Sequence, residues 1–294
     1  MNDATKPQRG TIVQEAAEVL SNEAHPGGQY ILQLRAPEIA RRAQPGAFVH
    51  LRCAPSLALR RPMSIMRANP RAGTIDMLFK AHGVGTAELA QRAPGESISA
   101  LGPIGVPFKL AGYRKRPLLI GGGVGMPPMV YLADHLRRST GSVPFVVLGS
   151  ELPFPFKLRP SAILVPGMPP GVIGTMPLLE DWGIAARLAS RQGYVGCFEG
   201  LVTELAAAWI QAMGVAALPE IEIFACGPTP MLKAVQSLAA RYGLPAQISL
   251  EEYMACAVGG CAGCTVRVHT PSGPAMKRVC VDGPVFEAST VEFS

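Results

Sequence analysis

The chain has 294 residues, enough for two or three domains, and 48% of them are hydrophobic, enough for a packed core. The net charge is +6, but the basic residues are scattered and the longest basic run is 114–116, which favours anionic cofactors and an acidic partner over nucleic acid. The longest uncharged stretch, 160–179, contains five prolines and three glycines, so we expect no membrane helix and no membrane partner.

Two features predict a cytoplasmic protein. Residues 1–20 contain no apolar signal core. Cys53, Cys197 and Cys226 are isolated from one another and give no disulfide framework. A reducing compartment suits both observations.

Residues 10–112 predict a small antiparallel β-barrel. Short strand-like segments follow one another, separated by glycine and proline. The expected strands are 29–34, 46–51, 74–79 and 97–101, with one short helix at 86–92.

Arg61-Pro62-Met63-Ser64 is the first motif within this barrel. An arginine can fork two N–H donors onto a pyrophosphate, and proline fixes the entry angle of the chain. The Ser64 hydroxyl could then meet flavin N5. The alternative is a strand whose Arg60 and Arg61 are simply solvated.

Gly83-Val84-Gly85-Thr86 is the second motif, three residues after Lys80. Glycine lets backbone N–H groups approach a phosphate, and we expect Thr86 to cap the helix that follows. An ordinary glycine turn with a capping threonine would look the same.

Residues 113–246 predict an open parallel α/β sheet that would bind NAD(P). Largely apolar runs, as in strands buried on both faces, alternate with helical segments. The runs are 117–120, 144–148, 162–165 and 221–225, and the expected helices are 128–138, 177–182, 203–213 and 230–242.

A glycine-rich turn follows the first of these runs and contains Gly121, Gly122, Gly123 and Gly125. A strand, a glycine turn and a helix form the usual site for a dinucleotide pyrophosphate, although this is not a strict G-x-G-x-x-G. The alternative is a tight turn that needs glycine only for its backbone.

Cys226-Gly227-Pro228 follows the last run, where a nicotinamide ring would pack against a small residue. Cys226 could equally be a small buried side chain. We do not interpret it as a nucleophile.

Residues 247–294 predict a metal-binding module. Cys256, Cys261, Cys264 and Cys280 read C-x4-C-x2-C-x15-C in a segment rich in glycine and alanine. The first two spacings are those of plant-type [2Fe–2S] ligation. Zinc, which usually takes two C-x2-C pairs, and unligated thiols remain the alternatives.

These motifs, in this order, resemble the electron-transfer subunit of NAD-linked (class 1B) dihydroorotate dehydrogenase, within the ferredoxin reductase superfamily. The resemblance covers roughly residues 10–290. It implies that FAD is held by Arg61, Pro62, Met63, Ser64, Leu78, Phe79, Lys80, Gly85 and Thr86. It implies that the glycine turn and the Cys226 region hold the nicotinamide cofactor and that the four cysteines hold the cluster.

The resemblance also implies an activity and a partner. In the family, electrons pass between a nicotinamide coenzyme, FAD, the cluster and an FMN-containing catalytic subunit, in pyrimidine (UMP) biosynthesis. A heterotetramer with that subunit is expected, and this chain alone should not oxidise dihydroorotate.

Three departures from the family pattern stand out. Lys80 replaces the usual arginine, which reduces a forked phosphate contact to a point charge. Ser190 and Arg191 stand where an acidic segment is usual, and because arginine suits a 2′-phosphate we expect NADP(H) to be tolerated or preferred. The proline-rich stretch 152–176 suggests no chemical role.

Two other functions fit the same residues. One is a reductase subunit of the same build that serves a hydrogenase, a ferredoxin or an oxygenase. The other is a non-enzymatic metal-binding sensor or interaction protein whose nucleotide sites have degenerated.

Overall fold

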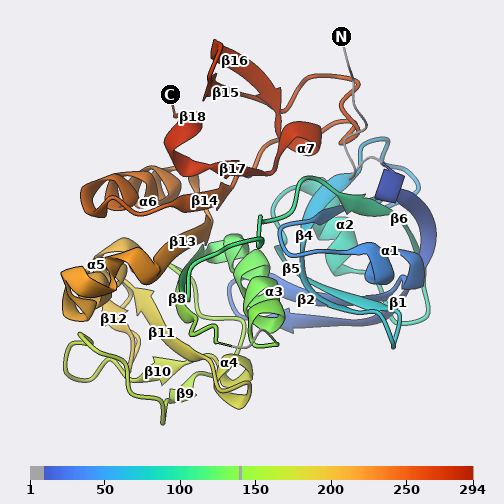
Figure 1. Cartoon of the computed structure of the whole chain (residues 1–294). Helices are drawn as coiled ribbons and strands as arrows, with labels where there is room; N and C mark the ends of the chain where they lie inside the picture. The colour runs from blue at the N-terminus through green and yellow to red at the C-terminus, as the bar shows by residue number, and fades with distance from the viewer. Residues whose placement is uncertain (1–9, 139–140, 294) are drawn as a thin grey trace. The chain divides into compact units, whose positions relative to one another are not determined.

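The computed structural model describes residues 10–138 and 141–293 (Figure 1). By packing, the chain forms two compact units. One runs to Phe108 and resumes over Leu250–Val285, and the other comprises Lys109–Ser249 and Phe286–Ser294. Within the described ranges, none of the helices is long and apolar enough to cross a membrane. The predicted boundaries 10–112, 113–246 and 247–294 remain a prediction about separate domains.

The first unit contains the predicted barrel, in which all strand pairs are antiparallel (Figure 1). The strands close in the order β1-β2-β5-β4-β3-β6. Their bounds are β1 (Val13–His25), β2 (Gln29–Arg35), β3 (Phe48–Leu51), β4 (Arg61–Asn69), β5 (Thr74–Lys80) and β6 (Ser97–Ile104). Side chains on a strand alternate between the two faces of the sheet, and alternate residues such as Leu32 and Leu34 of β2 are fully buried in the barrel core. Burial of this face explains why the strands close into a barrel.

Two short helices accompany the barrel. Helix α1 (Pro37–Arg42) was not predicted; the Glu15 carboxylate on β1 accepts the N–H groups of Glu38 at 3.0 Å and Ile39 at 2.8 Å in its first turn. Helix α2 (Val84–Ala90) begins two residues earlier than expected. A cap supplied by a neighbouring strand leaves no local sequence signal, which is why α1 was missed.

The predicted capping role of Thr86 is wrong. Gly83 is the N-cap of α2, with φ 81° and ψ 170°, and Thr86 lies inside the first turn. Its Oγ1 instead accepts the N–H of His82 at 2.6 Å and lies 2.8 Å from the His82 carbonyl oxygen. Because only glycine adopts the Gly83 conformation without strain, the backbone rather than the threonine decides where the helix begins.

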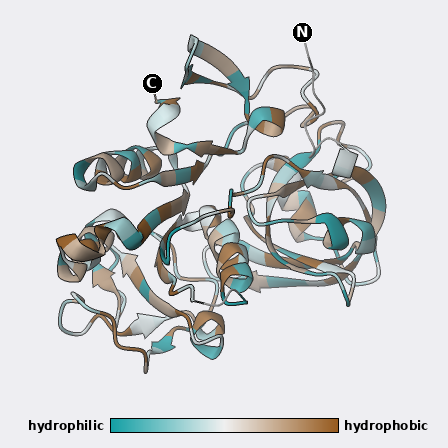
Figure 2. Ribbon diagram, in the orientation of Figure 1, coloured by the Kyte–Doolittle hydropathy of each residue, from teal (hydrophilic) through white to brown (hydrophobic). Residues whose placement is uncertain are grey.

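The second unit contains the predicted parallel sheet, in the order β12-β11-β8-β7-β13-β14-β17. The strands are β7 (Arg116–Gly122), β8 (Phe145–Gly149), β11 (Ala185–Ser190), β12 (Phe198–Glu199), β13 (Ile221–Cys226), β14 (Ala246–Ser249) and β17 (Val285–Glu287). Figure 2 shows hydrophobic stretches, in brown, along strands of this sheet and of the barrel. Strands β8 and β13 are buried along their whole length, as continuous apolar runs require.

The helices of this unit lie close to their predicted positions. They are α3 (Met126–Leu136), α4 (Pro177–Asp181), α5 (Val202–Met213) and α6 (Thr229–Tyr242), with the short 3-10 turns η2 (Gly123–Gly125) and η3 (Val215–Glu220). Prolines occupy the first turn of α3, where a missing N–H is harmless. The expected strand–turn–helix order at the glycine-rich turn is therefore present.

The expected strand at 162–165 is wrong. These residues form no strand, and Leu164 is 94% exposed. Strand β11 takes the place beside β8, and the segment between the two strands contains β9 (Arg159–Pro160), β10 (Gly174–Thr175) and α4. The buried Arg187 of β11 donates to the carbonyls of Ile163 at 2.7 Å and Val172 at 3.1 Å. A side chain thus satisfies carbonyls that a strand ladder would otherwise have paired.

The remaining C-terminal elements follow a loop that contains three of the cysteines. Strands β15 (Thr265–Thr270) and β16 (Gly273–Arg278) form an antiparallel hairpin, and α7 (Val279–Asp282) follows at once. Beyond β17 the chain ends in η4 (Ala288–Thr290) and β18 (Val291–Glu292).

Candidate functional site

The expected flavin motif lies on β4, and its arginine is packed against a glycine. A Cβ atom at Gly85 would lie 2.7 Å from Nε of Arg61 and 2.9 Å from its Cζ. The Arg61 Nη1 also donates to the backbone carbonyls of Leu59 and Arg60 at 3.0 and 3.1 Å. The two expected motifs, far apart in sequence, thus meet at the Arg61 guanidinium, and Gly85 is required for that approach.

The pairing of β3 with β4 shows which face of the sheet the other residues of this motif occupy. In the β3–β4 pair Phe48 lies opposite Ser64, and His50 lies opposite Pro62. Residues directly opposite in an antiparallel pair share a face, so Pro62 and Ser64 point to the same side of the sheet. Both are half-buried, whereas Met63, between them, is 7% exposed. Ser64 is therefore open to a ligand on that face, and Met63 belongs to the core.

The remaining expected flavin contacts differ in exposure. Leu78 and Phe79 are buried, and the Phe79 ring stacks on Tyr30 with centroids 5.3 Å apart. Lys80 is exposed, and Thr86 is half-buried. The β5 residues would therefore meet a ligand through backbone groups and Lys80 rather than through the Leu78 and Phe79 side chains.

The two loops expected to hold the nicotinamide coenzyme are packed together in the second unit. Strands β7 and β13 are neighbours, and Cys226 pairs with Gly121. A Cβ atom at Gly125 would lie 2.4 Å from the Cys226 carbonyl oxygen, and one at Gly122 would lie 2.5 Å from Sδ of Met231. These glycines let one loop approach the other at the carboxyl ends of two parallel strands, where open α/β sheets bind ligands.

Other expected residues in this region are less accessible. Cys226 and Gly227 are buried, and Pro228 is exposed. The Cys226 side chain has no exposed surface, so it fills the core at the end of β13. A small residue there lets the end of β13 pack closely against the glycine turn.

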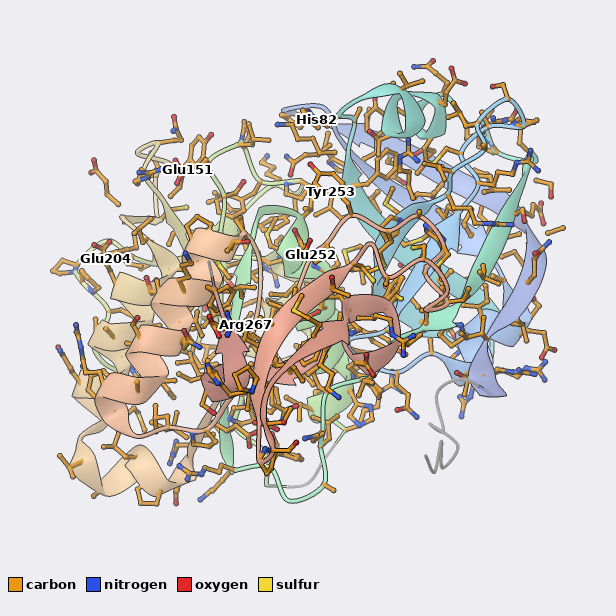
Figure 3. The ribbon with its side chains drawn as sticks, turned by 90° about the horizontal axis from the view of Figure 1, so that it is seen from above. His82, Glu151, Glu204, Glu252, Tyr253 and Arg267 are labelled. Carbon is orange, nitrogen blue, oxygen red and sulfur yellow. The ribbon has the colours of Figure 1, made fainter. Side chains whose placement is uncertain are left out.

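Ser190 is the last residue of β11 and Arg191 follows it, next to the end of β8. Ser190 is 1% exposed, and its Oγ accepts the N–H of Gln192 at 3.2 Å. Arg191 is exposed and forms an ion pair of 3.2 Å with Glu151, which follows β8 and is labelled in Figure 3. A hydrogen bond from Arg191 lowers the pKa of the Glu151 carboxyl. The expected phosphate-binding arginine thus already has an anionic partner, which the sequence analysis missed.

The four cysteine thiols are neighbours in the structure. Cys256 interacts with Cys261, and Cys280 interacts with Cys264 and more weakly with Cys256. The backbone holds Cys264 beside α7, because the Val279 N–H donates to the Cys264 carbonyl at 2.9 Å. Four thiolates are the ligand set of a [2Fe–2S] cluster.

The loop around the thiols supplies N–H groups and tight turns. Cys256 Sγ accepts N–H groups from Gly260 at 3.2 Å and Cys261 at 3.4 Å. Ala257 and Ala262 have φ of 56° and 55°, in a region that alanine rarely occupies. A loop that turns its N–H groups towards sulfur in this strained form fits a cluster, and residues with longer side chains would strain it further.

Burial and hydrogen bonding shift the pKa values of two of the thiols in opposite directions. Burial acts to raise the pKa of Cys256, but the N–H groups of Cys261, Val258 and Gly260 outweigh it and bring the pKa to about 7. Burial, together with the neighbouring Cys264, raises the pKa of Cys280 to about 12. Cys264 and Cys280 are buried and Cys261 is exposed, so one side of the site faces solvent.

Comparison with known proteins first defines the class. The chain superposes with a TM-score of 0.70 on the structure of an NADH-dependent reduced ferredoxin-NADP oxidoreductase, over 95% of this chain and 90% of that one, at 23% identity. Residues 251–292 match the family model of the iron–sulfur cluster binding domain of dihydroorotate dehydrogenase B. The chain has the ferredoxin reductase-like fold, with a cluster-binding domain near its C-terminal end.

The relatives then define the family. The chain is 35% identical over 271 residues to the dihydroorotate dehydrogenase B (NAD(+)) electron transfer subunit of Bacillus caldolyticus, covering 89% of this chain and 92% of that protein. It is 34% identical over 290 residues to the corresponding subunit of Geobacillus thermodenitrificans, covering 95% and 99%. The chain belongs to the electron transfer subunits of NAD⁺-dependent dihydroorotate dehydrogenase B, which confirms the predicted family.

Proposed function

We propose that this chain passes electrons between a nicotinamide coenzyme and an FMN-containing dihydroorotate dehydrogenase catalytic subunit, and that it holds FAD and a [2Fe–2S] cluster for this purpose. The observation that carries the proposal is that Cys256, Cys261, Cys264 and Cys280 lie together inside the matched cluster-binding segment. When bound, FAD exchanges two electrons with the coenzyme and the cluster carries single electrons.

The barrel residues bind and orient the flavin. The Arg61 guanidinium, seated over Gly85, is placed to fork onto a pyrophosphate. Pro62 and Ser64 share one face of β4, where the Ser64 hydroxyl can donate or accept a hydrogen bond. Met63, Leu78 and Phe79 form the buried floor behind them, and Lys80, Gly85 and Thr86 complete the proposed set.

The parallel sheet binds the coenzyme. Gly121, Gly122, Gly123 and Gly125 offer backbone N–H groups beside the opening of α3. The exposed Pro228 offers the adjacent surface for the nicotinamide ring, and the buried Cys226 and Gly227 support it from behind, with the carbonyl of Cys226 against Gly125. The proposed ribose end lies near Ser190 and Arg191.

Discrimination between the two coenzymes rests on Arg191 and Glu151. An acidic side chain at the end of a strand suits a ribose 2′-hydroxyl, and an arginine suits a 2′-phosphate. Because Arg191 is paired with Glu151, a 2′-phosphate would have to compete with a carboxylate. We therefore propose NAD(H) as the preferred coenzyme, with NADP(H) tolerance conditional on release of Arg191.

The partner docks where the cluster meets solvent. Cys261 is exposed, and the loop before it presents the exposed Glu252 and Tyr253, labelled in Figure 3. Docking on this side would bring the partner flavin within reach of the cluster. We propose a cytoplasmic heterotetramer with the catalytic subunit, acting in pyrimidine biosynthesis.

Co-purification tests the proposal. The tagged chain, expressed anaerobically with the dihydroorotate dehydrogenase subunit of the same organism, should elute as a complex with FAD, FMN, and two irons and two sulfides for each copy of this chain. Elution without that subunit, but with a ferredoxin or a hydrogenase subunit from a native extract, would favour the other reductase function. A chain that binds zinc and no flavin would contradict both.

A further inference from the structure

One buried histidine lies on the flavin-binding side of the barrel. His50 on β3 is opposite Pro62 on β4, so its ring shares a face with Pro62 and Ser64. Its side chain has no exposed surface. The sequence analysis gave His50 no role, because a single histidine in an apolar strand carries no motif.

Two segments cover this ring. The backbone of Met254, two residues before Cys256, and the backbone of Arg60 both lie close enough to the imidazole to interact with it. The neighbouring Phe48 ring approaches Gly105, which also contacts Pro284. His50 thus stands between the strand of the flavin motif and the loop that leads into the cysteines, within one compact unit.

Neither ring nitrogen of His50 has a hydrogen-bond partner among the described residues. An unpaired buried polar group costs roughly 1–3 kcal/mol. Burial, and secondly the charge of Arg60, lower the pKa of the ring to about 4, and Arg61 acts in the same direction. The ring is therefore neutral near pH 7, with one nitrogen to donate and one to accept.

The backbone against the ring can meet this need. A carbonyl on the loop at Met254 or at Arg60 can accept the ring N–H after a small shift, whereas arginine side chains offer only donors. Such a bond would join the flavin strand to the cluster loop directly. No other described histidine has this combination of full burial and two unpaired ring nitrogens.

We propose that His50 is a positioning residue that fastens the loop at Met254 to the flavin-binding strand and so fixes the placement of the cluster relative to the flavin. The proposal rests on the proposed function, in which both cofactors are bound to this chain. His50 touches neither cofactor in it. It acts by holding the two backbone segments together.

The test compares three variants of the reconstituted chain. His50→Phe keeps a ring of similar size but removes both nitrogens, and His50→Gln keeps one donor and one acceptor. His135→Gln, on an exposed site of α3, is the control. The readouts are flavin and iron content, the visible circular dichroism and electron paramagnetic resonance of the cluster, and its reduction potential.

We expect His50→Phe to retain flavin and iron but to change the circular dichroism and resonance spectrum of the cluster and to shift its potential. His50→Gln should restore the wild-type spectra and potential, and His135→Gln should leave them unchanged. If His50→Phe does not fold, His50→Leu takes its place with the same expectation. A His50→Phe or His50→Leu protein with wild-type spectra and potential would overturn the proposal, as would a Gln variant as altered as the Phe variant.

The flavin and iron contents separate this result from a failure of the proposed function. Wild-type protein that binds neither cofactor would refute the function itself. Wild-type protein that binds both, with His50→Phe unaltered, would refute only the role of His50.

Discussion

Gly85 lies against the guanidinium of Arg61 so closely that a Cβ atom at position 85 would approach Nε to 2.7 Å. Gly85→Ala should therefore displace the arginine, which is flexible, rather than the backbone. One charged hydrogen bond is worth about 1.5–3 kcal/mol, so FAD affinity should fall roughly tenfold to a hundredfold. Fluorescence titration of the apoprotein with FAD measures this.

A double-mutant cycle isolates this contact. In an Arg61→Ala background, Gly85→Ala should weaken FAD binding no further, because the displaced group is gone. Additive losses would show that Gly85 acts through the backbone instead of through Arg61.

Gly125 lies against the backbone of Cys226, which cannot move aside as a flexible side chain can. A Cβ atom would lie 2.4 Å from the Cys226 carbonyl oxygen. Gly125→Ala should lower the free energy of unfolding by about 1–3 kcal/mol and weaken NADH binding, because it forces the two loops apart. Denaturant unfolding and NADH titration check both effects, with Val124→Ala on the exposed neighbour as the control. An unchanged affinity for NADH would remove the glycine turn from the coenzyme site.

The Glu151–Arg191 pair should set coenzyme preference. Glu151→Gln frees Arg191, so the ratio of kcat/KM for NADPH to that for NADH should rise, by roughly tenfold for one charged contact. Steady-state reduction of an artificial acceptor by each coenzyme gives the ratio. The double variant Glu151→Gln/Arg191→Ala should lose the gain. If Glu151→Gln leaves this ratio unchanged, the Glu151–Arg191 pair does not determine coenzyme preference.

Arg187 should stabilise the loop that precedes β11. Its guanidinium donates to the carbonyls of the half-buried Ile163 and of the buried Val172 and Ala186, and Arg187→Leu would remove the donor from all three. Unpaired groups cost about 1–3 kcal/mol each, so the free energy of unfolding should fall by at least about 2 kcal/mol. Proteolysis within 161–173 should also accelerate. Arg159→Ala, which breaks an exposed ion pair with Asp181, should change stability by less than about 1 kcal/mol.

Much of this fold could be predicted because its patterns are local. Alternation in β2 and the apolar run in β7 each report burial directly. Local patterns did not predict the elements whose position depends on contacts between residues distant in sequence. The Glu15 carboxylate on β1 accepts an N–H group in the first turn of α1, and Arg187 donates a hydrogen bond to Ile163, which lies outside the sheet.

The candidate site shows the same division. Glycine, cysteine and arginine motifs were visible because their spacing is fixed by local chemistry. Glu151 and His50 were not, since each matters only through a residue distant in sequence: Arg191 for Glu151, and Pro62 and Met254 for His50. Register and burial, rather than residue type, identify them.

The central claim is that this chain conducts electrons between a nicotinamide coenzyme and a separate flavoprotein subunit. Anaerobic stopped-flow spectroscopy of the chain alone and of its complex with the catalytic subunit tests it most directly. NADH should reduce the flavin and the cluster in both samples, whereas dihydroorotate should reduce them only in the complex. Reduction of the isolated chain by dihydroorotate, or a complex in which dihydroorotate leaves its cluster oxidised, would contradict the claim.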